Sequence, residues 1–83
     1  MSINLFFKVK NGAGMVDFPF QTSTDLTYAV MNAEGKEERI KLLRLKLLSD
    51  EMRKWGWGLA DINEMLAEIE ALMDNQNLEL GCI

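Results

Sequence analysis

The sequence predicts a single α+β domain, in which an N-terminal antiparallel β-hairpin, with or without a third short C-terminal strand, packs against two or three α-helices. Three observations support this fold class. Apolar residues alternate with a period of two near the N-terminus, they recur at helical spacing from residue 22 onward, and turn-forming residues separate these segments. A chain of 83 residues with 48% apolar content suits one small globular core.

Residues 1–21 are predicted to form the hairpin. Apolar side chains occupy alternate positions of its first strand: Ile3, Leu5, Phe7 and Val9. Asn11-Gly12 then marks the turn, because both residue types tolerate positive φ, and Ala13-Gly14 is expected to lengthen the loop. The return strand is expected over residues 15–20. Pro19 lacks an N–H, which places that strand at an edge of the sheet or near its own end.

A short helix is predicted within residues 22–35. Thr22 is expected to cap its start, because a threonine side chain accepts a backbone N–H at that position, and Gly35 is expected to cap its end. Its apolar residues share one face at helical spacing: Leu26, Ala29, Val30 and Ala33. A helix this short persists only when it docks onto the rest of the fold.

A longer central helix is predicted over residues 36–55. Acidic residues stand near its start and basic residues near its end, an order that suits the helix dipole. Its apolar residues cover more of the circumference than a surface helix needs. We therefore expect this helix to contact more than one neighbouring element.

A last helix is predicted over residues 61–75, and residues 76–83 are expected to be either a third short strand or a loose tail. Asp61 and Glu64 have the layout of a capping box, with Asp61 as the N-cap. The predicted core draws on the hairpin and all three helices: Leu5, Phe7, Phe18, Leu26, Val30, Ile40, Leu43, Leu47, Ile69 and Leu72.

The composition argues against catalysis. The sequence has no histidine, and its one cysteine is Cys82. Without histidine, neither a Ser–His nor a Cys–His pair can form, and zinc loses a common ligand. Glu64 and Glu68 stand four residues apart, a spacing that suits acid–base chemistry or a divalent cation, but no other ligand type accompanies them. We expect no enzymatic activity, no cofactor and no metal.

The charge is distributed unevenly along the chain. The net charge is −4, of which residues 1–54 contribute +2 and residues 55–83, which contain no basic residue, contribute −6. This asymmetry indicates either an interaction surface or a basic helix packed against an acidic one. A lone cysteine favours a reducing compartment, the cytoplasm. No apolar run approaches the roughly 20 residues that span a bilayer, so no membrane partner is expected.

The segment Trp55-Gly56-Trp57-Gly58 is the main candidate for a binding surface. Tryptophan is enriched at binding hot spots, and neighbouring glycines leave its ring accessible. Trp55 continues the apolar stripe of the central helix and is expected to lie in the core. Trp57, in the turn, is expected to be more exposed. Together with Phe6 and Phe20 of the hairpin, it would supply the aromatic anchors for a partner.

Three basic residues recur every seven positions: Arg39, Lys46 and Arg53. On one continuous helix they would lie along a line at the rim of the binding surface, where they would contact a partner protein or the phosphates of a nucleic acid. Acidic residues interrupt this line and the chain is acidic overall. Nucleic acid is therefore disfavoured as a partner.

These features favour a non-enzymatic protein-binding module, an inhibitor or adaptor that occludes the surface of another protein. In size and composition the chain resembles small accessory proteins of bacteriophages and prophages, which implies a host protein as the partner that is inhibited or redirected. Two alternatives stay open. One is a structural subunit of a homo-oligomer, suggested by the broad apolar surface of residues 36–55, and the other is a nucleic-acid-binding protein that uses the basic helix 36–54.

Overall fold

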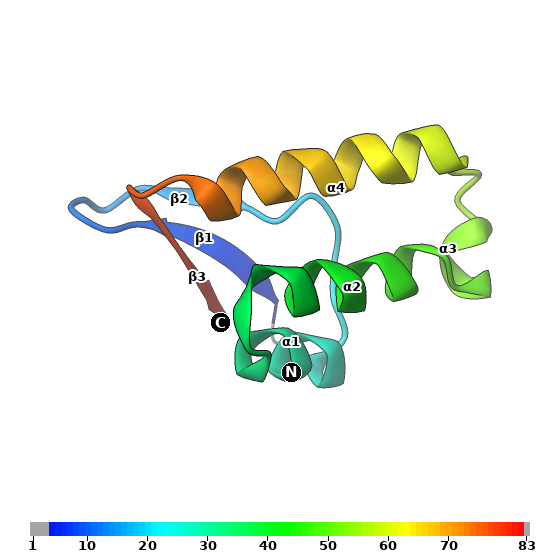
Figure 1. Ribbon diagram of the computed structural model, residues 1–83, viewed down its shortest axis with the longest axis horizontal. Helices are drawn as coiled ribbons and strands as arrows, with labels where there is room; N and C mark the ends of the chain where they lie inside the picture. The colour runs from blue at the N-terminus through cyan, green and yellow to red at the C-terminus, as the bar shows by residue number, and fades with distance from the viewer. Residues whose placement is uncertain (1–3, 83) are drawn as a thin grey trace.

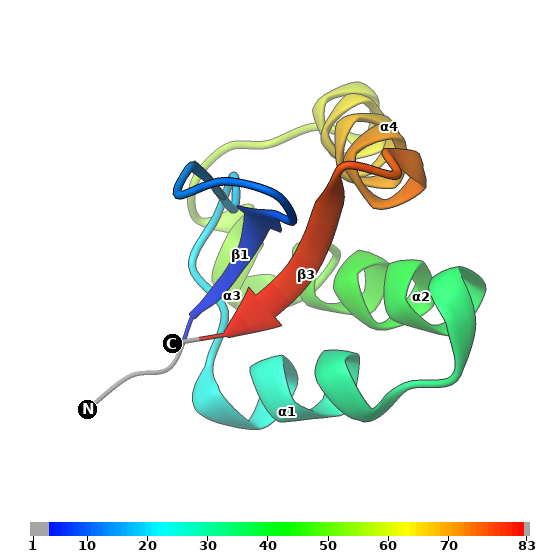
Figure 2. The same ribbon diagram turned by 90° about the vertical axis from the view of Figure 1, so that its left-hand side faces the viewer.

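The computed structural model describes residues 4–82 and confirms the α+β fold class. The elements in chain order are β1 (Leu5–Val9), β2 (Met15–Asp17), α1 (Thr24–Asn32), α2 (Gly35–Leu47), α3 (Asp50–Arg53), α4 (Leu59–Asp74) and β3 (Leu78–Cys82). The strands form one antiparallel sheet in the order β2-β1-β3 (Figure 1). α1 and α4 contact β3, and α2 packs against both of these helices (Figure 2).

The central strand of the sheet is β1, which pairs with both of the others. Phe7 stands opposite Val16 of β2 and opposite Leu80 of β3. Residues 78–82 therefore form the third strand, one of the two outcomes expected for this part of the sequence. Because successive side chains of a strand point to opposite faces, Leu5 and Phe7 are both buried, whereas Phe6 between them is only half-buried.

The hairpin connection is a longer loop, as Ala13-Gly14 indicated, but it lacks the positive φ expected at Asn11-Gly12. Residues 10–14 form this loop, which is closed by the Val9 N–H, donating to the Gly14 carbonyl at 3.0 Å, and by the Gly12 N–H, donating to the Val9 carbonyl at 3.4 Å. Hairpin loops of this length are most often built around a type I turn, which requires no positive φ.

The second strand is shorter than predicted. β2 ends at Asp17, two residues before Pro19, and it is an edge strand, as the proline indicated. Beyond β2 the chain carries two aromatic rings inward. Phe18 stacks on Phe7 with ring centroids 5.9 Å apart, and Phe20 meets Phe18 edge-on at 5.3 Å.

The predicted caps of the first helix were wrong. The N-cap of α1 is Ser23, whose Oγ accepts the Leu26 N–H at 3.1 Å. Thr22 is buried instead, and its hydroxyl shares a 2.6 Å hydrogen bond with the Thr27 hydroxyl. Gly35 does not cap α1. It is the first residue of α2 and has a φ of 88°, a conformation that glycine adopts without a steric penalty.

The central helix predicted over residues 36–55 is two helices. α2 ends at Leu47, and Ser49 is extended, with φ −68° and ψ 155°, before α3 begins. Serine is unfavourable inside a helix, because its hydroxyl competes with the backbone for hydrogen bonds. At the N-cap position of a helix it is favourable, because the same hydroxyl can accept a backbone N–H. The break changes the direction of the chain, and Met52 of α3 is buried in the core.

The last helix begins earlier than predicted. α4 starts at Leu59 with Gly58 as its N-cap, so Asp61 is not the N-cap. Asp61 stands at the third helical position, where its Oδ2 accepts the Gly58 N–H at 3.1 Å. This is the reciprocal half of a capping box, shifted by three residues from its predicted place.

The predicted core is largely correct but incomplete. Six of its members are buried: Leu5, Phe7, Val30, Leu43, Leu47 and Ile69. Four are partly buried and pack against them: Phe18, Leu26, Ile40 and Leu72. The buried apolar residues that the sequence patterns did not place in the core are Phe20, Met52, Ile62 and Leu66. Three of these four belong to α3 and α4, the elements that follow the unexpected break.

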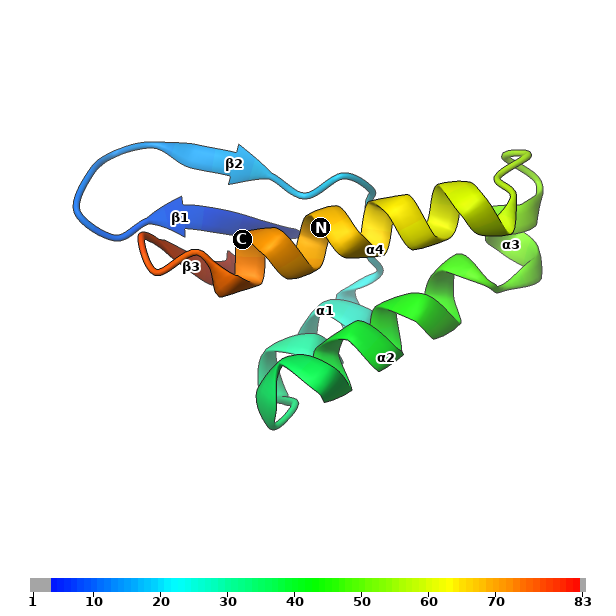
Figure 3. The same cartoon turned by 45° about the horizontal axis from the view of Figure 1, so that its top comes forward.

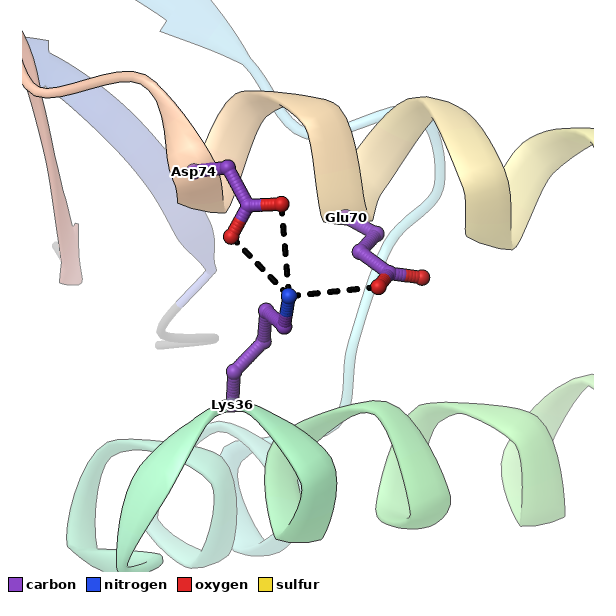
Figure 4. A network of polar contacts seen from close by, with 3 residues as sticks. All are labelled: Lys36, Glu70 and Asp74. Atoms are coloured by element: carbon purple, nitrogen blue, oxygen red, sulfur yellow. Dashed lines mark hydrogen bonds and ion pairs between the residues drawn. The ribbon is translucent and has the colours of Figure 1, made fainter.

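The basic α2 packs against the acidic α4, one of the two arrangements that the charge asymmetry indicated. Lys36 Nζ lies 3.0 Å and 3.2 Å from the two carboxylate oxygens of Asp74, and 3.2 Å from Glu70 Oε1 (Figure 4). The hydrogen bonds to Asp74 and then to Glu70 raise the pKa of Lys36 above its ordinary value of 10.5. Further along α2, Arg44 Nη1 donates to Asn63 Oδ1 at 3.1 Å.

Candidate protein-binding surface

One end of the molecule carries an apolar groove, here called the aromatic groove. Figures 1 and 3 show α3 and the start of α4 at the end opposite the loop between β1 and β2. There the segment that follows β2 meets α3 and the residues after it. The groove has a volume of about 300 Å³ and is lined by Pro19, Phe20, Gln21, Met52, Trp55 and Trp57.

The two tryptophans have the opposite exposure to the one predicted. Trp55 is 72% exposed, whereas Trp57 is half-buried and packs against the core. The cause is the break at Ser49, because of which Trp55 no longer continues the apolar stripe of α2. Gly56 then adopts a φ of 76°, and this left-handed turn reverses the chain before Trp57.

The hairpin phenylalanines lie in different places. Phe20 lines the aromatic groove, but only 9% of its surface is exposed, so it is mainly a core residue. Phe6 lies over the neighbouring strand, where a Cβ added at Gly81 would come within 3.0 Å of its ring. Phe6 does not line the groove. The structure therefore brings together Trp55, Trp57 and Phe20, but not Phe6.

The three basic residues predicted at the rim do not form one line. Arg39 is used inside the fold: its Nε donates to the Val30 carbonyl at 3.0 Å and its Nη2 to the Met31 carbonyl at 3.5 Å. These carbonyls lie in the last turn of α1, where a cation is favourable. Lys46 is half-buried in α2 and Arg53 is exposed in α3, and the break between these helices separates the two.

A second groove, here called the acidic groove, adjoins the first because Trp57 lines both. It has a volume of about 400 Å³ and is lined by Trp57, Asp61, Glu64, Met65 and Glu68. Glu64 and Glu68 are exposed, and neither forms an ion pair with any of residues 4–82. The sequence contains no basic residue after Lys54 that would neutralise them locally.

Most of the side chains that line the two grooves are aromatic rings, thioethers and carboxylates, groups that can hold a partner by shape and charge. In the part of the chain that the structure describes, no three His, Cys, Asp or Glu side chains are grouped so as to hold a metal ion. Across the same residues, no helix has both the length and the apolar character that crossing a bilayer requires.

Sequence reasoning missed two parts of this surface. It did not place Met52 in the groove, nor residues 19–21 opposite α3. A signal for the first existed: Ser49 followed by two acidic residues is the pattern of a helix start. Comparison with known protein families, curated proteins and solved structures finds no match for this chain.

Proposed function

We propose that this protein is a non-enzymatic protein-binding module that holds a partner at the aromatic groove and occludes part of the partner's surface. The observation that carries the proposal is the position of Trp55, an indole that is 72% exposed beside a groove walled by Trp57 and Met52. Covering an exposed apolar surface releases roughly 25 cal/mol per Å². Tryptophan is also prominent among the residues that dominate binding energies.

The groove supports an anchoring mechanism. An apolar side chain of the partner would enter between Trp55 and Trp57 and contact Met52, whose flexible thioether adapts to the shape of its neighbour. A volume of about 300 Å³ lies at the small end of the range for ligand pockets, and it suits one or two inserted side chains. The resemblance to small phage and prophage accessory proteins suggests a host protein as the partner.

The two alternative functions have less support. The homo-oligomer was suggested by the broad apolar surface of the predicted central helix. Most of that surface is covered by the core of the single chain. Leu43 and Leu47 are buried, and Ile40 is partly buried against them. Nucleic-acid binding was suggested by the three basic residues spaced seven apart. Arg39, one of the three, already donates hydrogen bonds to backbone carbonyls of α1.

Affinity purification with three baits tests the proposed function. The baits are the wild-type chain, Trp55→Ser and Leu45→Ser, each incubated with lysate of the native host cell, in which the protein is produced. Leu45 is the matched control, because it is a large apolar residue of α2, 60% exposed, that does not line the groove. We expect a stoichiometric partner on the wild-type and Leu45→Ser baits, reduced more than about fivefold on Trp55→Ser.

Two results would contradict the proposal. Equal recovery of the same partner on all three baits would place the contact on another surface. Absence of any stoichiometric partner from all three baits, with each bait shown to be folded, would count against protein binding as the function.

A further inference from the structure

Trp57 lies at the boundary between two surfaces of different character. On the aromatic groove it is joined by Phe20, Met52 and Trp55, and on the acidic groove by Met65 and three carboxylates. A partner segment that crosses Trp57 would therefore meet apolar side chains first and negative charge next. A segment that matches both grooves has to be amphipathic.

The acidic residues of α4 fall into two groups that differ in their partners. Glu70 and Asp74 both contact the ammonium group of Lys36 and share its single positive charge (Figure 4). Glu64 and Glu68 have no ion pair within residues 4–82, although they stand one turn apart on the same helix face. Like charges at this spacing weaken a helix, and a cation beside them relieves the repulsion. The face of α4 that carries Glu70 and Asp74 therefore has a basic partner, Lys36, whereas the face at the acidic groove has none among the described residues.

The indole of Trp57 adds a second reason for a cation. The face of a tryptophan ring attracts the ammonium group of lysine or the guanidinium group of arginine. A basic side chain placed in the acidic groove would contact this ring and the neighbouring carboxylates together. An acidic segment, or the phosphates of a nucleic acid, would instead be repelled by Glu64 and Glu68.

Building on the proposed function, we infer that the partner presents a cationic amphipathic segment to the two grooves. One of its apolar side chains occupies the aromatic groove, and its lysine or arginine side chains lie over Trp57 and against Glu64 and Glu68. The apolar contact supplies most of the affinity, and the charges select the partner and its direction.

Titration by nuclear magnetic resonance tests this inference on the full chain. The probe is a synthetic amphipathic helical peptide of leucine and lysine, and its control is the same peptide with every lysine replaced by glutamate. The chain has two tryptophans, so its two indole N–H signals report directly on Trp55 and Trp57. We expect both signals to shift saturably with the lysine peptide and to stay in place with the glutamate peptide. Equal shifts with both peptides would overturn the inference.

A pair of charge-matched variants separates local from long-range attraction. Glu64→Gln/Glu68→Gln removes two negative charges from the acidic groove, and Glu34→Gln/Glu79→Gln removes two from exposed positions outside it. We expect the first pair to lower the affinity for the lysine peptide about three- to tenfold and the second pair to change it less than twofold. Equal losses in both pairs would show attraction by net charge alone and would overturn the inference.

The inference and the proposed function fail in different ways. If Trp55→Ser abolishes capture of the natural partner while Glu64→Gln/Glu68→Gln leaves its affinity unchanged, the groove binds a partner but the inferred chemistry is wrong. If the indole signals move when the protein alone is concentrated, a second copy of the chain occupies the groove, and the cationic segment is again the wrong occupant. If Trp55→Ser has no effect on capture, the proposed function itself fails.

Discussion

Ser23 and Ser49 are both the N-cap of a helix, but only Ser23 forms a capping hydrogen bond through its side chain. Ser23 Oγ accepts the Leu26 N–H at 3.1 Å at the start of α1. Ser49 Oγ at the start of α3 is buried, and it has no hydrogen-bond partner among the described residues. A cap hydrogen bond stabilises a helix, whereas a buried hydroxyl without a partner costs free energy. The same residue type at the same helical position therefore has opposite effects.

Alanine substitution should separate these two effects. We expect Ser23→Ala to lower the free energy of unfolding by about 1 kcal/mol, and Ser49→Ala to leave it unchanged or raise it by up to about 1 kcal/mol. Urea denaturation followed by circular dichroism measures both. A comparable loss of stability in the two variants would show that Ser49 caps α3 through a contact that the structure lacks.

The two tryptophans should respond differently to truncation because one is exposed and the other packs against the core. We expect Trp55→Ala to change the free energy of unfolding by less than about 0.5 kcal/mol and to weaken partner binding by more than about 1 kcal/mol. Trp57→Ala should lower the free energy of unfolding by about 1–3 kcal/mol, since it removes a partly buried ring. Urea denaturation and calorimetric titration measure the two quantities. A larger loss of stability for Trp55→Ala would contradict the assigned exposures.

At the scale of elements, periodicity predicted the strands and helices well, because it reports which face of each element is buried. The apolar stripe of residues 36–55 did not predict the break at Ser49, since the same spacing continues across it. The exposure of both tryptophans depends on that break. Local patterns therefore located the candidate binding segment but assigned its two rings the wrong way round.

The contact between α2 and α4 should make stability depend on alkaline pH. The neighbouring carboxylates raise the pKa of Lys36, so the folded chain binds that proton more tightly than the unfolded chain. The contribution is fully present below 10.5, the ordinary pKa, and it is lost as the pH rises through the raised value. Between about pH 10 and 12 the wild type should lose more thermal stability than Lys36→Gln.

The control for this experiment is Lys41→Gln, which removes an exposed lysine from the same helix. Thermal unfolding of all three proteins at a series of pH values gives the comparison. Lys41→Gln should follow the wild type. If Lys36→Gln follows it as well, the ion pairs with Glu70 and Asp74 do not contribute to stability in solution.

At the scale of the whole molecule, the sheet joins the two ends of the sequence. β3 pairs with β1 through five residue pairs, and Phe7 stands opposite Leu80. The sequence indicated that residues 76–83 would be a strand or a tail, but strand order depends on long-range pairing that no local pattern encodes. The aromatic groove has the same origin, because residues 19–21 and α3 meet only in the folded chain.

Removal of residues 76–83 should therefore abolish cooperative folding. The truncated chain would leave one edge of β1 unpaired and expose buried apolar side chains such as Phe7. A domain this small has only a few kcal/mol of stability in reserve. Glu79→Ala, an exposed position of β3, is the control and should unfold cooperatively. A cooperative thermal transition in the truncated chain would show that the core does not depend on β3.

The most direct test of the central claim is amide hydrogen exchange of the protein alone and in complex with its purified partner. The claim is that the partner contacts the two grooves that share Trp57. We expect the complex to slow exchange at residues 54–58, which connect α3 to α4, and to leave the hairpin loop at residues 10–14 unchanged. Slower exchange confined to that loop or to α1, with residues 54–58 unaffected, would contradict it.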